Sequence, residues 1–152
     1  MKIREYMSTP VITIKKQTGV QDALRIMRMQ RIRRLPVVDD SNHLIGIVSE
    51  RDLLYASPSP ATSLSVWELN YLLAALEVGS LMSRNVFSTT PDATLQSAAR
   101  LMLQHKIGGL PVVDRNQCVV GVITESDIFR AFLDREEDDT KTERPVVAAM
   151  TG

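Results

Sequence analysis

Only one cysteine, Cys118, is present in the 152 residues, so no disulfide can form within the chain. A low cysteine content is typical of reducing compartments, and we expect a cytoplasmic protein. The formal net charge is zero, which argues against a protein that binds nucleic acid mainly through its phosphates. No apolar run approaches the roughly 18 residues of a membrane helix, and the first residues lack the apolar segment of a signal peptide, so no membrane contact is expected.

Recurrent catalytic and metal-binding motifs are also missing. The two histidines, His43 and His105, fall far apart in different kinds of element, and Cys118 falls in a predicted turn. The sequence has no Cys-x-x-Cys, no His-Glu-x-x-His and no Gly-x-Ser-x-Gly. The acidic run at 136–139 could attract a cation, but a solvated tail is the commoner explanation. We therefore expect no metal site, no obligatory cofactor and no enzymatic activity.

What the chain does contain is an internal repeat. When Met7-Ser8 is aligned with Met82-Ser83, the register holds at an offset of 75 residues, without a gap, to Leu54 and Phe129. The segment "RIRRLPVVDD" then faces "KIGGLPVVDR", and "LIGIVSERD" faces "VVGVITESD". Each copy of such a repeat forms one supersecondary unit that buries its apolar face on its neighbour. The sequence thus predicts two similar units that share a core.

Each unit has the pattern strand, helix, strand, strand, helix. Residues 11–14 and 86–89 are short β-rich runs, and apolar residues with helical spacing follow each of them. The runs "LPVVD" and "LIGIVS" have strand length and flank a polar stretch, which predicts a hairpin. Thr18, three residues before Gln21, has the form of a capping box for the first helix. Glycines within predicted strands, Gly46 and Gly121, indicate close approach by another backbone or by a ligand.

The repeat divides the chain into four parts. They are a first motif at 1–56, a linker and helix at 57–77, a second motif at 78–135, and a charged, flexible tail at 136–152. In the linker, Ser65 is expected to cap a helix that runs to about Glu77. That helix carries Trp67, Tyr71 and Leu72 as apolar groups available for burial.

Two units of this order, each with an apolar-Pro-Val strand and a Gly-apolar-apolar-Ser/Thr-x-x-Asp ending, resemble a tandem pair of cystathionine β-synthase (CBS) domains, the Bateman module. The resemblance covers roughly residues 1–135, and the "SPSPATSLS" insert resembles stand-alone bacterial regulatory proteins of the acetoin-utilisation type. It implies an α/β (α+β) fold in which two β-α-β-β-α motifs pack with pseudo-twofold symmetry around two clefts. In this family such clefts typically bind adenine nucleotides or S-adenosylmethionine and signal to an effector.

The repeated endings supply four candidate binding residues, Ser49, Asp52, Thr124 and Asp127. In one interpretation they only cap helices, with a hydroxyl on an early N–H and an acid near the positive end of the dipole. In the other, implied by the resemblance, the aspartates bind the ribose hydroxyls and Ser49 and Thr124 bind ribose or phosphate. The two interpretations are compatible, because a helix start that faces a cleft can also bind an anion.

Arginines in the first repeat are candidates for binding phosphate, since their planar fork matches phosphate oxygens. The resemblance assigns this role to Arg33 and Arg34, which precede the strand proline. The alternative is a solvated basic face, which we prefer for Arg25 and Arg28. A nucleic-acid patch is disfavoured, because the basic residues lack interleaved aromatics.

The two clefts are predicted to be unequal. The second repeat has Gly108 and Gly109 where the first has the two arginines, and Arg51 also has no basic counterpart. We therefore expect a phosphorylated nucleotide to prefer the cleft that contains Asp52. An arginine that reaches across to the other unit would undo this asymmetry.

The resemblance adds further candidates around the clefts. They are the strand-end hydroxyls Thr13 and Ser88, the strand prolines Pro36 and Pro111, and Ile12, Ile32, Phe87 and Ile107, which could line an adenine pocket. The alternative for the two hydroxyl residues is a strand residue that faces solvent, and for the four apolar residues it is an ordinary place in the core.

The main functional hypothesis is a non-enzymatic regulatory module that binds an adenosyl ligand, forms a homodimer and signals to a separate effector protein. The alternative is a constitutive dimerisation or docking scaffold without a small ligand. An enzyme would be favoured only if a bound nucleotide were turned over.

Overall fold

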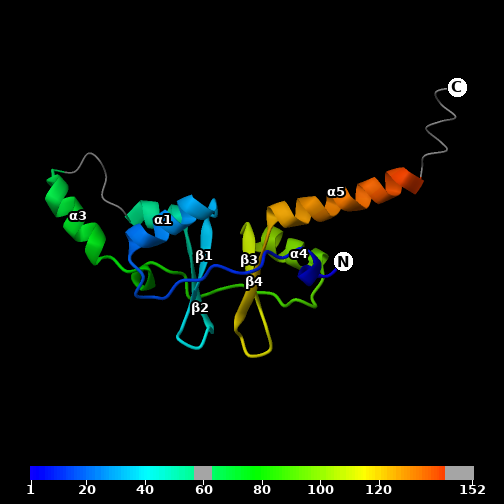
Figure 1. The fold of residues 1–152 in the computed structure, drawn as a ribbon, viewed down its shortest axis with the longest axis horizontal. Helices are drawn as coiled ribbons and strands as arrows, with labels where there is room; N and C mark the ends of the chain where they lie inside the picture. Colours follow the sequence, from blue (N-terminus) through cyan, green and yellow to red (C-terminus); the bar gives the residue numbers. More distant parts are fainter. Residues whose placement is uncertain (57–62, 143–152) are drawn as a thin grey trace, which may run out of the picture.

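The computed structural model describes residues 1–56 and 63–142, with side chains described through Asp138 (Figure 1). In chain order the elements are the 3-10 helix η1 (Ile3–Glu5), α1 (Val20–Gln30), β1 (Arg34–Val38), β2 (Leu44–Ser49), α2 (Glu50–Ala56), α3 (Val66–Ala75), the 3-10 helix η2 (Val78–Ser80), α4 (Leu95–His105), β3 (Gly109–Val113), β4 (Val119–Thr124) and α5 (Glu125–Thr142). The mixed α+β class expected from the sequence is confirmed.

Two antiparallel hairpins stand side by side at the centre of the molecule (Figure 1). β1 pairs with β2 and β3 with β4 in the same register, so that Pro36 faces Ile47 and Pro111 faces Val122. The hairpins predicted from the repeated apolar runs are therefore confirmed. Their equivalent registers give the two units the same internal geometry.

The turns of the two hairpins bind each other. His43 and Cys118 form an antiparallel bridge, and the Asn42 carbonyl accepts the Val119 N–H at 3.2 Å. The Asn42 side chain returns a bond to the Val119 carbonyl at 3.1 Å. A small apolar cluster drawn from both hairpins, Val38, Val113 and Val119, lies beside this contact. Equivalent residues thus meet at the pseudo-twofold axis.

The start of each repeat pairs with the sheet of the other repeat. Ser83 bonds Ile47 of β2 through both of their backbone groups, at 2.9 and 3.0 Å, and Ser8 pairs in the same way with Val122 of β4. The predicted close approach at the strand glycines is confirmed as backbone contact: a Cβ on Gly46 would lie 3.1 Å from the Ser83 carbonyl oxygen. A Cβ on Gly121 would lie 3.2 Å from the Ser8 carbonyl oxygen. The units therefore interlock.

Each hairpin has its own apolar core beneath a helix. α1 presents Val20, Ala23 and Met27 to the first hairpin, and α4 presents Leu95, Ala98 and Met102 to the second. These are the helical apolar positions of the repeat. The cores anchor the strand ends from which the candidate site residues emerge.

Two local predictions were wrong. Residues 11–14 and 86–89 do not form strands; each run contributes a single parallel bridge, Ile14 to Val37 and Thr89 to Val112. Only one residue of each run reaches a hairpin edge, because the preceding segment must cross to the other unit. Thr18 also makes no cap for α1, whose N-cap is Gly19; its hydroxyl accepts the Lys15 N–H instead.

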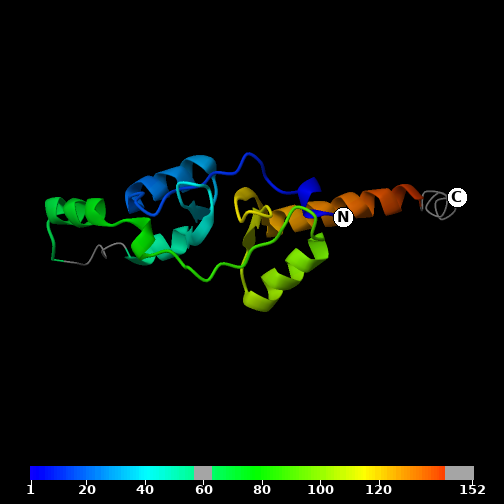
Figure 2. The ribbon, with the colours of Figure 1, turned by 90° about the horizontal axis from the view of Figure 1, so that it is seen from below.

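The two outlying helices lie at opposite ends of the molecule in both views (Figures 1 and 2). Ser65 caps α3 by accepting the Glu68 N–H, as predicted, but α3 ends at Ala75 and buries none of its side chains. Trp67 is 85% exposed. α5 continues to Thr142, so the predicted tail is helical over 136–142, while 143–152 lie outside the described residues. Across the described chain, no helix has the length and apolarity to cross a membrane.

Candidate functional site: the Asp127 pocket

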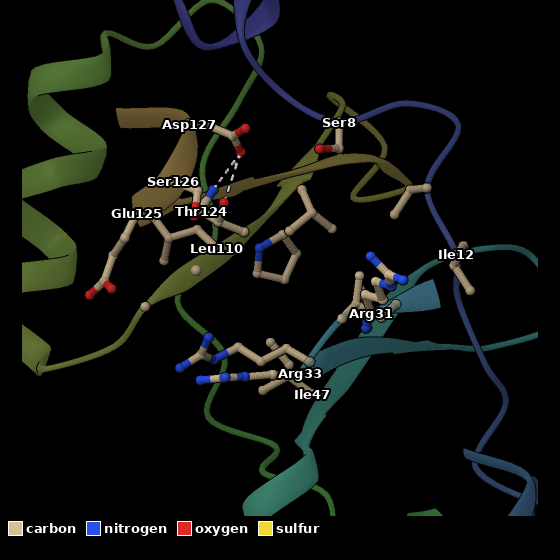
Figure 3. Close-up of a pocket in the computed structure, with 18 of the residues that line it drawn as sticks. Ser8, Ile12, Arg31, Arg33, Ile47, Leu110, Thr124, Glu125, Ser126 and Asp127 are labelled. Atoms are coloured by element: carbon tan, nitrogen blue, oxygen red, sulfur yellow. Dashed lines mark hydrogen bonds between the residues drawn. The ribbon is translucent and has the colours of Figure 1, made fainter. Parts of the chain in front are cut away.

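A cavity of about 570 Å³ lies between the two units and is lined by both of them. We call it the Asp127 pocket. Its walls comprise Ser8, Pro10, Val11, Ile12, Arg31, Ile32, Arg33, Arg34, Pro36 and Ile47 from the first unit, and Gly108, Gly109, Leu110, Pro111, Val122, Thr124, Glu125, Ser126, Asp127 and Arg130 from the second. Figure 3 shows Thr124 and Asp127 across the pocket from Ile12 and Arg31, with Arg33 between the two sides.

Asp127 is the buried carboxylate of this pocket, with only 2% of the residue exposed. It stands in the first turn of α5, where its Oδ2 accepts the Thr124 N–H at 2.9 Å and the Thr124 hydroxyl at 3.0 Å (Figure 3). Its Oδ1 accepts Nη2 of Arg130 at 3.1 Å. The β4 to α5 junction thus places a carboxylate with three donors at the pocket wall, because a buried charge needs such partners. The capping interpretation correctly places the acid in the first helical turn, but the Thr124 hydroxyl donates to Asp127 instead of accepting an early helix N–H. The carboxylate remains in a position to meet a ligand.

Arginines from the first unit reach into the pocket of the second. Arg31 ends α1 in the left-handed conformation, with φ of 55°, and Arg33 and Arg34 lead into β1. Nη1 and Nη2 of Arg34 lie 3.0 Å from where a Cβ on Gly108 would stand. The small residue of the second repeat therefore makes room for an arginine of the first.

The predicted asymmetry of the clefts rests on arginines that are not confined to one cleft. The prediction places Arg33 and Arg34 only in the cleft containing Asp52, whereas they line both the Asp127 pocket and a second pocket beside Ser49. The sequence places them in the first repeat, whereas the fold brings them across the pseudo-twofold axis. A phosphate bound near Asp127 would therefore face the arginines expected to serve the other cleft.

The equivalent cleft on the first unit is shaped differently. A second pocket, also of about 570 Å³, is lined by Arg33, Arg34, Ser49, Glu50, Arg51, Leu54 and Tyr55. Asp52 is exposed and absent from this lining, and the Ser49 hydroxyl accepts its N–H at 3.1 Å. For Ser49 and Asp52 the structure therefore shows the capping arrangement. Arg51 lies 5.4 Å from the Tyr55 ring centroid and lowers the pKa of the Tyr55 hydroxyl through a hydrogen bond.

Several other candidates fall outside both pockets. Thr13 and Ser88 are half-buried and line neither. Phe87 stacks on His105 with ring centroids 3.7 Å apart and packs with Ile107 in the core of its own unit. Their counterparts Ile12 and Ile32, together with Pro36 and Pro111, do line the Asp127 pocket.

Sequence reasoning missed two cations of the site. Arg31 stands in the segment "RIRRLP" but is not among the predicted phosphate ligands, although its place directly after the last helical turn could have indicated a helix end at a cleft. Arg130 stands three residues after Asp127, a spacing that puts both on one face of a helix. Within the described residues, no group of three or more histidine, cysteine or acidic side chains could hold a metal ion.

Comparison with known proteins identifies the family. The CBS domain model matches residues 3–59 and 78–134. The chain belongs to the CBS domain family, as a tandem pair. The structure of the CBS pair is similar to AcuB, a protein named for acetoin utilization from Vibrio cholerae, with a TM-score of 0.76 and 33% identity over 93% of this chain and 96% of that one.

Two further solved structures carry ligands. The Arabidopsis thaliana protein CBSX2 in complex with AMP has a TM-score of 0.74 and 31% identity, covering 88% of this chain and 97% of that chain. The CBS pair of protein MJ0100, in complex with 5′-methylthioadenosine and S-adenosyl-L-methionine, has a TM-score of 0.74 and 28% identity, covering 89% and 98%. Related CBS pairs therefore bind adenosyl compounds.

Proposed function

We propose that this CBS pair is a non-enzymatic regulatory module that binds an adenosyl ligand in the Asp127 pocket. The candidates are AMP, ADP, ATP and S-adenosylmethionine. The observation that carries the proposal is a buried carboxylate on one unit facing arginines of the other across one cavity. A carboxylate can accept hydrogen bonds from both hydroxyls of a ribose, and guanidinium groups match phosphate oxygens.

The remaining wall residues suit the rest of an adenosyl compound. Ile12 and Ile32 are half-buried and give the pocket an apolar surface for the adenine ring. Pro36 and Pro111 lie at equivalent places on β1 and β3 and border the same cavity. The AMP, methylthioadenosine and S-adenosylmethionine held by related pairs support this class of ligand.

A thermal-shift screen over AMP, ADP, ATP and S-adenosylmethionine tests the proposal. A ligand that binds only the folded chain, at about 100 times its Kd, adds roughly 2.7 kcal/mol, which raises the Tm of a chain this size by about 5–10 °C. Guanine and cytosine nucleotides are matched controls for phosphate charge. A Tm that no adenosyl compound raises more than these controls would contradict the proposal.

We also propose a homodimer formed through the exposed faces of α2 and α5. These faces carry Leu54, Tyr55, Phe129, Phe132 and Leu133, each more than half exposed. Closed twofold dimers are the commonest soluble oligomers, and a stable interface buries about 1,600 Å². Sedimentation at tens of micromolar should show a dimer that Phe129→Glu weakens and that Leu103→Glu, at a still more exposed position on α4, does not. A single monomeric species would contradict this arrangement.

The signal is proposed to pass to a separate effector protein in the cytoplasm, where the single cysteine stays reduced. The second candidate function is a constitutive docking scaffold without a small ligand. It is favoured by α3, which exposes Trp67 (85%), Tyr71 (76%) and Leu72 (44%). Dimerisation without any adenosyl-dependent shift would support the scaffold, whereas turnover of a bound nucleotide would contradict the non-enzymatic proposal.

A further inference from the structure

Both oxygens of Asp127 are already engaged within the chain. Oδ2 receives two donors from Thr124, and Oδ1 receives Nη2 of Arg130. A carboxylate oxygen offers about two acceptor sites, so Oδ2 is saturated, whereas Oδ1 has one site left for a ribose hydroxyl and Arg130 holds the other. Arg130 is the group that a ribose would meet there.

Arg130 is bonded to Asp127, yet most of its side chain is exposed to solvent. Its side chain is 61% exposed, against 3% for Asp127, and it lines the same pocket. Only the arginine end of this pair is exposed. Because Asp127 is buried, its Oδ1 can give up Arg130 only in exchange for another donor, such as a ribose hydroxyl. An anionic group in the pocket would offer Arg130 a bidentate partner in place of Oδ1.

We propose that Arg130 is a specificity-determining residue, which gives up its site on Asp127 Oδ1, and so lets the carboxylate accept both hydroxyls of a ribose, only when the ligand brings a phosphate that Arg130 can bind. The inference rests on the proposed function, and it selects phosphorylated adenosine compounds over S-adenosylmethionine. The sulfonium of S-adenosylmethionine is a cation, and Arg31, Arg33 and Arg34 line the same pocket. Its methionyl carboxylate is one anionic group at the far end of a flexible chain, whereas a nucleotide carries its phosphate directly on the ribose.

The described part of the first unit has no equivalent of the Arg130–Asp127 pair. The residue aligned with Arg130 is Tyr55, whose hydroxyl is 3.5 Å from Nη2 of Arg51. Arg51 therefore interacts with Tyr55, and Asp52 is exposed at the surface. The coupling of ribose to phosphate is thus a property of the Asp127 pocket.

The test compares ATP, AMP, adenosine and S-adenosylmethionine by isothermal titration on wild type, Arg130→Gln and Arg130→Lys. Loss of one charged hydrogen-bonding partner should weaken ATP and AMP roughly tenfold or more in Arg130→Gln. Adenosine and S-adenosylmethionine should bind as tightly as before, or more tightly, because Oδ1 is freed. Arg130→Lys keeps the charge and should recover part of the nucleotide affinity. Arg135→Gln, an exposed arginine on the same helix outside the pocket, is the matched control and should change nothing.

The outcomes separate this inference from the proposed function. If wild type binds no adenosyl compound, the proposed function fails and the role of Arg130 fails with it. If wild type binds adenosyl compounds but prefers S-adenosylmethionine to ATP, the proposed function stands and the inference is wrong. Equal losses of affinity for ATP and for adenosine in Arg130→Gln would show that Arg130 only maintains the structure of the pocket. An unchanged ATP affinity would also overturn the inference.

Discussion

Replacing Gly46 with alanine tests the interlocking of the two units. A Cβ there would lie 2.5 Å from Sδ of Met82 and 3.1 Å from the carbonyl oxygen of Ser83. The methionine sulfur can rotate away, but Ser83 is held by two backbone bonds to Ile47, so its carbonyl can retreat only if that pairing loosens.

The cost follows from this overlap. Overpacking of a tight contact typically costs about 1–3 kcal/mol. A loss of about 2 kcal/mol corresponds to a Tm lowered by roughly 4–8 °C for a chain of this size. Gly121→Ala should cost a similar or smaller amount, because its Cβ would lie 2.9 Å from Sδ of Met7 and 3.2 Å from the Ser8 carbonyl oxygen.

Urea and thermal unfolding would measure these losses, with Gly109→Ala as the control. Gly109 is also a strand glycine, but the nearest atoms to its added Cβ are 3.5 Å away, an ordinary contact. Its replacement should be neutral or slightly stabilising, since alanine restricts the unfolded chain. If Gly46→Ala were as stable as Gly109→Ala, the reciprocal pairing of segment and sheet would be wrong.

Two further predictions concern the hairpin turns. Asn42→Ala removes the bond to the Val119 carbonyl and leaves alanine at a φ of 65°, so unfolding in urea should show a loss of about 1–2 kcal/mol. Asn42→Gly should lose only the hydrogen-bond part, and equal stability of all three chains would contradict the contact between the turns. At Asp39, the backbone N–H of His43, assisted by that of Ser41, lowers the carboxyl pKa. Its stabilising effect is therefore present above the unfolded pKa of about 3.9 and is lost as the pH falls through the lower folded value. The stability gap between wild type and Asp39→Asn should shrink as the pH falls below about 4, and a gap independent of pH would refute this assignment.

The register of the internal repeat predicts most of the fold. Because "LPVVD" and its following apolar run recur at one offset, both hairpins and the helices that flank them could be placed from the sequence. The strands expected at 11–14 and 86–89 failed for a tertiary reason: their neighbours Ser8 and Ser83 pair with the opposite unit, and one residue of each run remains for its own hairpin. Local β propensity cannot predict that these segments cross to the other unit.

Several residues of the candidate site could be predicted from the sequence, but the way in which the two units bring them together could not. Thr124 and Asp127 follow from the repeated motif, and their role at the start of a helix follows from capping chemistry. Which arginines face them depends on the pseudo-twofold packing, which the repeat cannot reveal because it treats both units alike. Gly108 was interpreted as the lack of a cation, whereas its small size admits the guanidinium of Arg34.

The central claim is that a nucleotide binds at Asp127 and depends little on Asp52. The most direct measurement is titration of ATP into wild type, Asp127→Ala and Asp52→Ala, with melting curves of each to confirm folding. Because charged hydrogen bonds are worth about 1.5–3 kcal/mol each, we predict that Asp127→Ala weakens ATP at least tenfold and Asp52→Ala changes its Kd less than about twofold. Equal losses in the two variants, or a larger loss in Asp52→Ala, would contradict the account.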